Sequence, residues 1–199
     1  MRIFFLIFSL VTVSFALNIN DSLLKIHATL IPKIYLMDYN VEKKIHNKTM
    51  VIAILYGNNT YKSAKSLKEK IATRYPDGIN SYKIIAKLVP YSQLSKSKAN
   101  IFYMLPTSKK MIQQSVRHAQ EESALTFAYD KNDLNYGVMI SLNVSKKIKP
   151  ILNLEAIKIN NIEMRPILIK ISLIYAYSRN SYLDRTQIES LNSLQIYRA

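Results

Sequence analysis

The chain has 199 residues, of which 49% are hydrophobic and 21% charged, and its formal net charge is +15. This length and composition predict one ordinary globular domain, whose core is large enough to be stable without disulfides or metal ions. Because the sequence contains no cysteine, it excludes thiol catalysis, CxxC redox chemistry and any zinc site built on cysteine.

The positive charge by itself would suit a nucleic acid, an anionic lipid or an acidic protein surface as partner. The lysines, however, are scattered among Asn and Ile along the whole chain, as the codon bias of an AT-rich genome produces. This spread, together with the signal-peptide pattern of residues 1–16 described next, argues against a nucleic-acid partner.

Residues 1–16 have the pattern of a signal peptide. Arg2 supplies the positive charge, residues 3–13 form an apolar run, and Ser14 and Ala16 are the small residues of a cleavage site. The run is too short to span a membrane, which takes about 20 residues. We therefore expect a mature periplasmic protein of residues 17–199, a single domain without an integral membrane segment; an uncleaved N-terminal anchor is the alternative.

The first element of the mature chain is predicted to be a helix. Asp21 and Ser22 resemble an N-cap, and apolar residues recur at helical spacing as far as Tyr35. Pro32 is expected to interrupt this helix, either by a kink or by leaving one backbone carbonyl unpaired. The polar segment 38–48 is predicted to be a loop.

Strands and helices then alternate. Runs of β-forming residues predict strands at 49–56, 82–89, 99–105 and 124–129, and amphipathic patterns predict helices at 61–75 and from a Thr107 or Ser108 cap to Glu121. The order strand, helix, strand, strand, helix, strand predicts an α/β fold with a mostly parallel central sheet and helices on both faces.

The C-terminal part follows a different pattern. Residues 138–144 and 149–154 flank a short basic turn and predict an antiparallel hairpin appended to the sheet. A short turn or helix at 155–160 and an apolar helix at 166–177 should follow. Residues 178–199 are polar and are expected to form a loosely packed tail.

The three histidines are not arranged as metal ligands in sequence. His27 lies on the apolar face of the first predicted helix, which indicates a core histidine rather than a ligand. His46 and His118 lie among charged residues, where solvation is the simpler interpretation. No HExxH or similar spacing occurs.

Other catalytic patterns are also absent from the sequence. With three glycines, the chain has no phosphate-binding loop or dinucleotide fingerprint, and it has no GxSxG elbow. Glu121 and Glu122 are neighbours on a predicted helix and therefore point apart. Asp130, Asp133 and Asp184 are interpreted as isolated loop carboxylates. We therefore expect no catalytic residue, no cofactor, no bound metal and no enzymatic activity.

Three segments resemble the YfiR family of small periplasmic proteins. Residues 23–35 are similar to the family's opening helix, residues 151–162 to its "INLxAAxxAGLxIS" run, and residues 167–171 to its closing leucine-rich helix. The resemblance covers most of residues 20–177. The chain departs from the family at Ile157, at Asn160-Asn161 and in lacking the family's cysteines.

The resemblance implies a periplasmic repressor that binds the sensor domain of an inner-membrane diguanylate cyclase or histidine kinase. Binding would hold the partner inactive and lower cytoplasmic cyclic-di-GMP, and release would raise it and favour biofilm. A homodimer is compatible with this interpretation. The family-motif residues are expected to be structural rather than binding, with Asn153 bonded to backbone and Leu154 and Ala156 packed on the sheet; they are Asn153, Leu154, Glu155, Ala156, Leu168 and Lys170.

Two other classes of protein remain open. A parallel sheet binds ligands at the carboxyl ends of its strands, so the chain could be a periplasmic small-molecule binding protein that resembles one lobe of a solute receptor. One domain of this size is too small for the usual two-lobed clamp. An uncharacterised enzyme ranks last, because the sequence offers no site for it.

Overall fold

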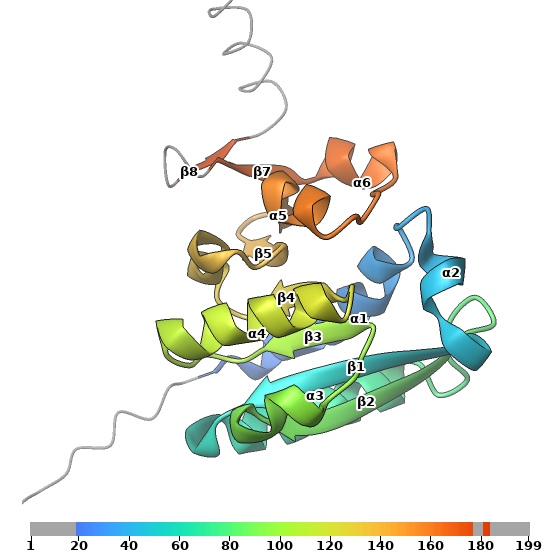
Figure 1. Ribbon diagram of the computed structural model, residues 1–199, viewed down its shortest axis with the longest axis vertical. Helices are drawn as coiled ribbons and strands as arrows, with labels where there is room; N and C mark the ends of the chain where they lie inside the picture. The colour runs from blue at the N-terminus through green and yellow to red at the C-terminus, as the bar shows by residue number, and fades with distance from the viewer. Residues whose placement is uncertain (1–18, 177–180, 184–199) are drawn as a thin grey trace, which may run out of the picture.

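The computed structural model describes residues 19–176 and 181–183, so the predicted signal peptide and most of the predicted tail lie outside the described residues. A single eight-stranded sheet runs through the molecule in the order β2-β1-β3-β4-β5-β6-β7-β8 (Figure 1). The strands are β1 (Thr49–Tyr56), β2 (Lys83–Pro90), β3 (Ile101–Met104), β4 (Leu125–Ala128), β5 (Ile140–Val144), β6 (Ile148–Leu152), β7 (Leu173–Ala176) and β8 (Ser181–Leu183).

The described residues also form six α-helices and four short 3-10 turns. The helices are α1 (Asp21–Tyr35), α2 (Val41–Lys44), α3 (Tyr61–Arg74), α4 (Lys109–Glu121), α5 (Leu154–Ile159) and α6 (Pro166–Ile171). The 3-10 turns are η1 (His46–Lys48), η2 (Asn58–Thr60), η3 (Tyr91–Lys96) and η4 (Lys131–Tyr136). Among the residues described, no helix has the length and apolar composition that a membrane span requires.

The sheet is mostly parallel. Strand β1 pairs in parallel with β2 and β3, β3 with β4, and β4 with β5, whereas β5 and β6 form an antiparallel hairpin. Strand β7 then adds in parallel to β6, and β8 pairs antiparallel with β7. The predicted α/β class and the predicted C-terminal hairpin are therefore both confirmed.

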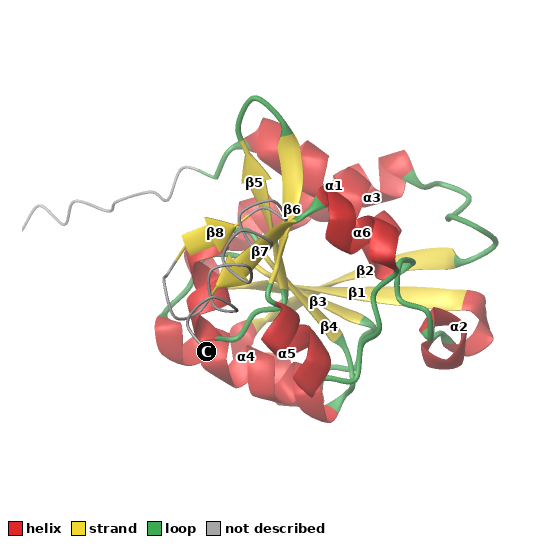
Figure 2. Cartoon of the chain, turned by 90° about the horizontal axis from the view of Figure 1, so that it is seen from above, coloured by secondary structure: helices red, strands yellow, loops and turns green. Residues whose placement is uncertain are grey.

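The two faces of the sheet have separate cores because side chains alternate along each strand. On β1, Met50, Ile52 and Ile54 join the core under α1 and α3, whereas Ala53 and Leu55 join the core under α4. Figure 2 shows α1 and α3 on one side of the sheet and α4 on the other. The alternation explains why β1, an unbroken apolar run, is buried on both faces.

Helix α1 ends at Tyr35, as its apolar spacing predicts, but its N-cap differs from the prediction. Its N-cap is Asn20, whose Oδ1 accepts hydrogen bonds from the Ser22 and Leu23 amides at 2.9 and 3.2 Å, rather than Asp21 or Ser22. Pro32 does not interrupt the helix, which continues to Tyr35. Because Pro32 lies in the last turn and has no N–H, it removes one intrahelical hydrogen bond without breaking the helix, which is the second of the two effects predicted for it.

The predicted helix at 166–177 is wrong in its second half. Helix α6 ends at Ile171, and Leu173–Ala176 form strand β7 against β6. The Ser172 hydroxyl donates to the Leu168 carbonyl at 2.7 Å while its backbone becomes extended. The β-forming residues that follow then gain a pairing partner, which overrides the continuous apolar pattern. Strand β8, within the predicted tail, extends the sheet by one more strand.

Candidate functional site

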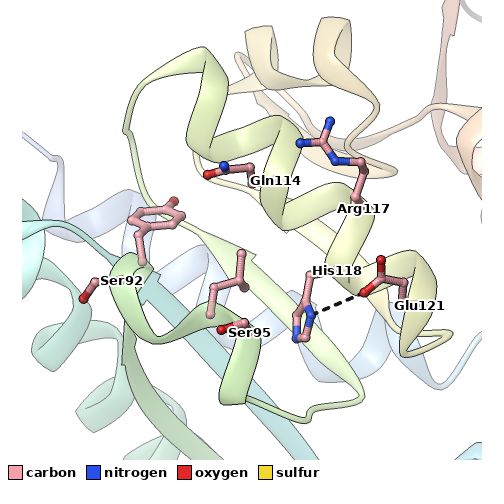
Figure 3. Close-up of a pocket in the computed structure, with 8 residues that line it drawn as sticks. Ser92, Ser95, Gln114, Arg117, His118 and Glu121 are labelled. Atoms are coloured by element: carbon pink, nitrogen blue, oxygen red, sulfur yellow. Dashed lines mark ion pairs between the residues drawn. The ribbon is translucent and has the colours of Figure 1, made fainter.

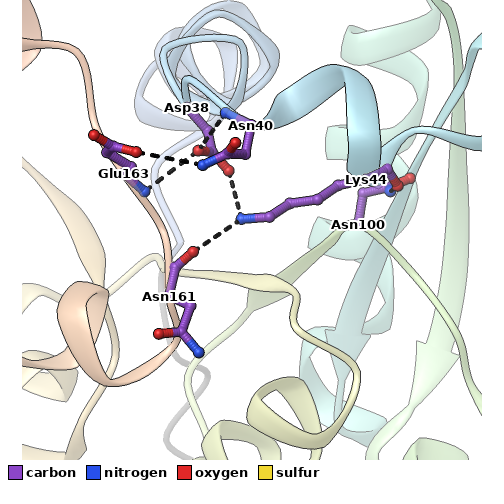
Figure 4. Close-up of polar contacts among 6 residues, drawn as sticks. All are labelled: Asp38, Asn40, Lys44, Asn100, Asn161 and Glu163. Atoms are coloured by element: carbon purple, nitrogen blue, oxygen red, sulfur yellow. Dashed lines mark hydrogen bonds and ion pairs between the residues drawn. The ribbon is translucent and has the colours of Figure 1, made fainter.

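A buried carboxylate joins two parts of the chain that are distant in sequence (Figure 4). Asp38 follows α1, and its Oδ2 lies 2.6 Å from the Lys44 ammonium. Its Oδ1 accepts the backbone amides of Asn40 at 3.0 Å and of Glu163 at 3.3 Å. One side chain therefore orders the turn into α2 and also holds the segment between α5 and α6.

Backbone hydrogen bonds complete this connection. The Tyr39 amide donates to the Glu163 carbonyl at 2.8 Å, and the Arg165 amide donates to the Met37 carbonyl at 2.8 Å. We call these two backbone hydrogen bonds and the contacts of the Asp38 carboxylate the Asp38 lock. The lock holds residues 37–40 against residues 163–165. The sequence indicated only a polar loop over 38–48, whereas the structure contains α2 and η1 there.

The lock is also tied to the sheet. The Asn100 amide group donates to the Lys44 carbonyl at 2.8 Å, and its Oδ1 accepts the Val51 amide of β1 at 2.7 Å. Because β1 is paired on both sides, with β2 and β3, α2 and the Asp38 lock are attached to the interior of the sheet.

An exposed surface is built directly on the lock. The Arg165 guanidinium lies 5.5 Å from the centre of the Tyr39 ring, whose residue is 53% exposed. Ile167 and Ile171 stand one helical turn apart on α6 and are 55% and 52% exposed, while Leu168 is buried beneath them. We call Tyr39, Arg165, Ile167 and Ile171 the α6 surface.

The composition of the α6 surface suits binding to another protein. Tyrosine and arginine are the residues that most often dominate the binding energy of protein interfaces. A cation–π contact between them orders both side chains before any partner arrives. The exposed Ile167 and Ile171 add apolar area to the same surface.

Removing the carboxylate of the lock should destabilise the whole protein. Asp38→Ala removes the acceptor of two backbone amides and leaves the Lys44 ammonium with only the Asn161 carbonyl, at 3.5 Å. We expect a loss of about 3 kcal/mol in the free energy of unfolding. Urea denaturation measures this loss. Asp77→Ala is the matched control, because Asp77 is exposed; a similar loss in both variants would show that the lock contributes nothing.

The residues of the family motif are divided between two places. Asn153 caps α5 through a 3.1 Å hydrogen bond from the Ala156 amide, and its Nδ2 donates to the Leu134 carbonyl at 3.3 Å. Ala156 is buried and Leu154 is half-buried against the main core. Asn153, Glu155 and Ala156 line one shallow hollow of about 210 Å³.

The other two motif residues lie on α6. Leu168 is buried in the main core, and Lys170 is exposed beside Ile171. The motif therefore contributes directly to the scaffold of the α6 surface. Tyr39 and Arg165 were not predicted, since nothing in the local sequence indicates that these two positions meet.

A second hollow, of about 330 Å³, lies between η3 and α4 (Figure 3). His118 stands at its edge, and its Nε2 lies 2.8 Å from the Ser97 carbonyl while its ring contacts Phe102 edge-on. Its Nδ1 is 3.9 Å from Glu121. The interpretation of His118 as a solvated surface histidine is therefore wrong, because it braces the η3 segment against α4.

Two buried titratable side chains remain without full hydrogen bonding. His27 is fully buried, as expected for a core histidine; its Nδ1 is 2.8 Å from the Tyr103 hydroxyl, and Nε2 has no partner among the described residues. Burial lowers the pKa of His27 to about 3. No group of three or more metal-ligating side chains occurs in the part of the chain that the structure describes.

Asp133 is a correction to the sequence interpretation. It was interpreted as an isolated loop carboxylate, yet it is buried in η4, where its Oδ2 has no partner among the described residues. Burial, with a smaller contribution from the charge of Asp130, raises the pKa of Asp133 to about 7. Asp184 lies outside the described residues.

Comparison with known proteins supports the fold. No family model and no curated protein matches the sequence. Among solved structures, the chain is similar to a conserved domain protein from Vibrio cholerae O1 biovar El Tor, with 12% identity and a TM-score of 0.54 over 76% of this chain and 59% of that one. The ABC domain from Streptococcus pneumoniae, solved in complex with L-Trp, has 11% identity and a TM-score of 0.46, with 71% and 60% coverage.

The fold therefore places the chain in the class of mostly parallel α/β domains. The chain spans about three fifths of the length of both similar structures. At such low identity the likeness to the Vibrio protein shows the fold alone, and the resemblance to the YfiR family stays a prediction from the sequence.

Proposed function

We propose that this protein is a periplasmic, non-enzymatic regulator that binds the sensor domain of an inner-membrane diguanylate cyclase or histidine kinase and holds it inactive. The observation that carries the proposal is the α6 surface, where Ile167 and Ile171 are exposed beside the Tyr39–Arg165 pair. Both isoleucines belong to the segment that resembles the closing helix of the YfiR family.

The charge of the chain favours an acidic partner surface. Arg165 and Lys170 are exposed next to the two isoleucines, and the whole chain has a formal charge of +15. A positive surface accelerates association with a negative one and disfavours positive partners. The apolar residues then supply the binding energy at the centre of the contact.

The Asp38 lock makes this surface ready to bind. Because Tyr39 and Arg165 are already held by backbone hydrogen bonds, little conformational entropy is lost when a partner docks. The regulator would act by binding one conformation of the sensor domain more tightly than the other, which shifts the population of the sensor without any covalent step.

Substitutions on α6 test the proposal in cells of its source. Deletion of the gene should raise cyclic-di-GMP or change kinase output, and the wild-type gene should restore it. Ile167→Asp/Ile171→Asp should fail to restore it, because burying two carboxylates weakens binding by at least about 30-fold.

The matched control is Tyr61→Asp/Ile148→Asp, which changes two large apolar residues, both 45% exposed, on α3 and β6. This variant should restore the wild-type output. Thermal unfolding of both purified variants checks that they fold. The proposal is lost if deletion leaves both outputs unchanged, or if the two variants behave alike.

A second candidate function is small-molecule binding at the carboxyl ends of β4 and β5. A hollow of about 340 Å³ lies there, lined by residues that include Tyr129, Asp130, Leu142 and Asn143. Parallel sheets bind ligands at this edge. A thermal-shift screen of amino acids and small organic acids tests it, and the absence of any stabilising compound would exclude this candidate.

A further inference from the structure

The connection between β2 and β3 lacks the long helix that the neighbouring connections contain. The chain passes from β1 to β2 through the 14-residue helix α3 and from β3 to β4 through the 13-residue helix α4. Between β2 and β3 it forms only η3, a six-residue 3-10 turn. The α4 face of the sheet is therefore incompletely covered beside β2, since parallel strands are usually joined by a covering helix.

A hollow of about 230 Å³ occupies this uncovered part of the sheet. Ala53 of β1 and Val89 of β2 line it, and both belong to or pack against the core on the α4 face. Lys87 pairs in register with Ala53, so its side chain projects from the same face of the sheet. The apolar side chains of Ala53 and Val89 therefore lie beside the Lys87 ammonium in this hollow.

Two more cations reach the hollow from the segment after β2. Lys96 and Lys98 line it together with Lys87, and all three are exposed. No carboxylate lines this hollow, and none of the three lysines forms an ion pair with a residue that the structure describes. We call this cavity, lined by Lys87, Lys96 and Lys98, the three-lysine hollow.

The backbone between Lys96 and Lys98 is rigidly held. The Ser97 amide and hydroxyl both donate to the Leu94 carbonyl, at 2.9 and 2.6 Å, and the Ser97 carbonyl lies 2.8 Å from His118 Nε2. The backbone that carries Lys96 and Lys98 is therefore ordered. An ordered backbone lowers the entropy lost on binding, because only the two side chains remain to be fixed.

We propose that the three-lysine hollow binds the phosphate group of a small organic phosphate or of a lipid headgroup. Lysines bind phosphate as point charges, and an anion between them relieves their mutual repulsion. The site goes beyond the proposed regulator function, because β2 and η3 lie at the opposite end of the molecule from α6 (Figure 1). Failure of either proposal leaves the other intact.

Calorimetric titration of the purified protein with inorganic pyrophosphate tests the site. The wild type should bind saturably, and Lys87→Ala/Lys96→Ala/Lys98→Ala should bind at least about tenfold more weakly. The control Lys62→Ala/Lys65→Ala/Lys68→Ala removes the same charge from exposed positions on α3 and should stay within about twofold of the wild type. Equal weakening in both variants would overturn the proposal, as would the lack of saturation.

Vesicles distinguish the two sources of phosphate. The same three proteins are sedimented with vesicles of phosphatidylglycerol and phosphatidylcholine in equal parts. Loss of vesicle binding in the hollow variant alone supports a lipid headgroup, and equal vesicle binding by both variants supports a soluble phosphate. Tighter, lysine-dependent binding of a single-stranded oligonucleotide than of either probe would overturn the proposal in favour of a nucleic-acid site.

Discussion

The stability of an Asp133→Asn variant relative to the wild type should increase by about 4 kcal/mol between pH 3 and pH 8. Burial, followed by the charge of Asp130, raises the pKa of Asp133 from 3.8 to about 7. A raised pKa gives stability that is complete below pH 3.8 and is lost as the pH rises through 7, because the folded protein must then bury a carboxylate. Asparagine is isosteric and has no charge to bury.

Urea denaturation at pH 3, 5 and 8 measures the effect. Comparing the change with pH removes any constant effect of the new amide group on the unfolding free energy. Asp77→Asn serves as control, since Asp77 is exposed and its substitution should leave the pH dependence unaltered. Parallel curves for Asp133→Asn and the wild type would contradict the burial of this carboxylate.

Between pH 7 and pH 3, the free energy of unfolding of a His27→Phe variant should fall by about 4–5 kcal/mol less than that of the wild type. Burial lowers the pKa of His27 from 6.5 to about 3. Protonation of the unfolded chain therefore favours unfolding as the pH falls below 6.5, and the loss is complete near pH 3. Phenylalanine fits an environment that already contains the rings of Tyr103, Phe127 and Tyr129.

The substitution also removes the hydrogen bond between His27 and the buried Tyr103 hydroxyl. A second variant, His27→Phe/Tyr103→Phe, removes both partners and should recover stability at pH 7. His46→Phe, at an exposed position, should retain the wild-type pH dependence. If His27→Phe loses as much unfolding free energy between pH 7 and pH 3 as the wild type, this histidine is not buried in its neutral form.

The two groups act in opposite directions between pH 3.8 and pH 6.5. His27 makes the protein more stable as the pH rises through this window, whereas Asp133 makes it less stable. Their contributions nearly cancel in the wild type. In each single variant, the free energy of unfolding should therefore change with pH in this window as the remaining group alone dictates.

Much of the fold could be predicted because its signals are local. The run at β1 is apolar from Met50 to Leu55, and the stripe Ala64, Leu67 and Ile71 on α3 is buried as its spacing predicts. The division of 166–177 into α6 and β7 could not be predicted, because an unbroken apolar run fits a buried helix and a buried strand equally well. Pairing with β6 decides between them.

The candidate site depends on contacts that are remote in sequence. Asp38 meets the Glu163 amide, and Tyr39 meets Arg165, across more than half of the chain. The polar segment 38–48 has the composition of an ordinary loop, and its sequence does not indicate that it contacts residues 163–165. Near the α6 surface, the resemblance indicated only the segment 167–171, in which Leu168 and Lys170 were named as motif residues. His118 was misjudged for the same reason, since Ser97 lies on a different element.

Site-specific photo-crosslinking tests the regulator function most directly. Benzoylphenylalanine is placed at Ile171, on the α6 surface, or at Ile148, an exposed isoleucine on the hairpin, and cells of its source are irradiated. A crosslink from position 171 but not from 148 to an inner-membrane protein with a cyclase or kinase domain is the predicted result. No crosslink from position 171, or equal crosslinking from both positions, would contradict binding through the α6 surface.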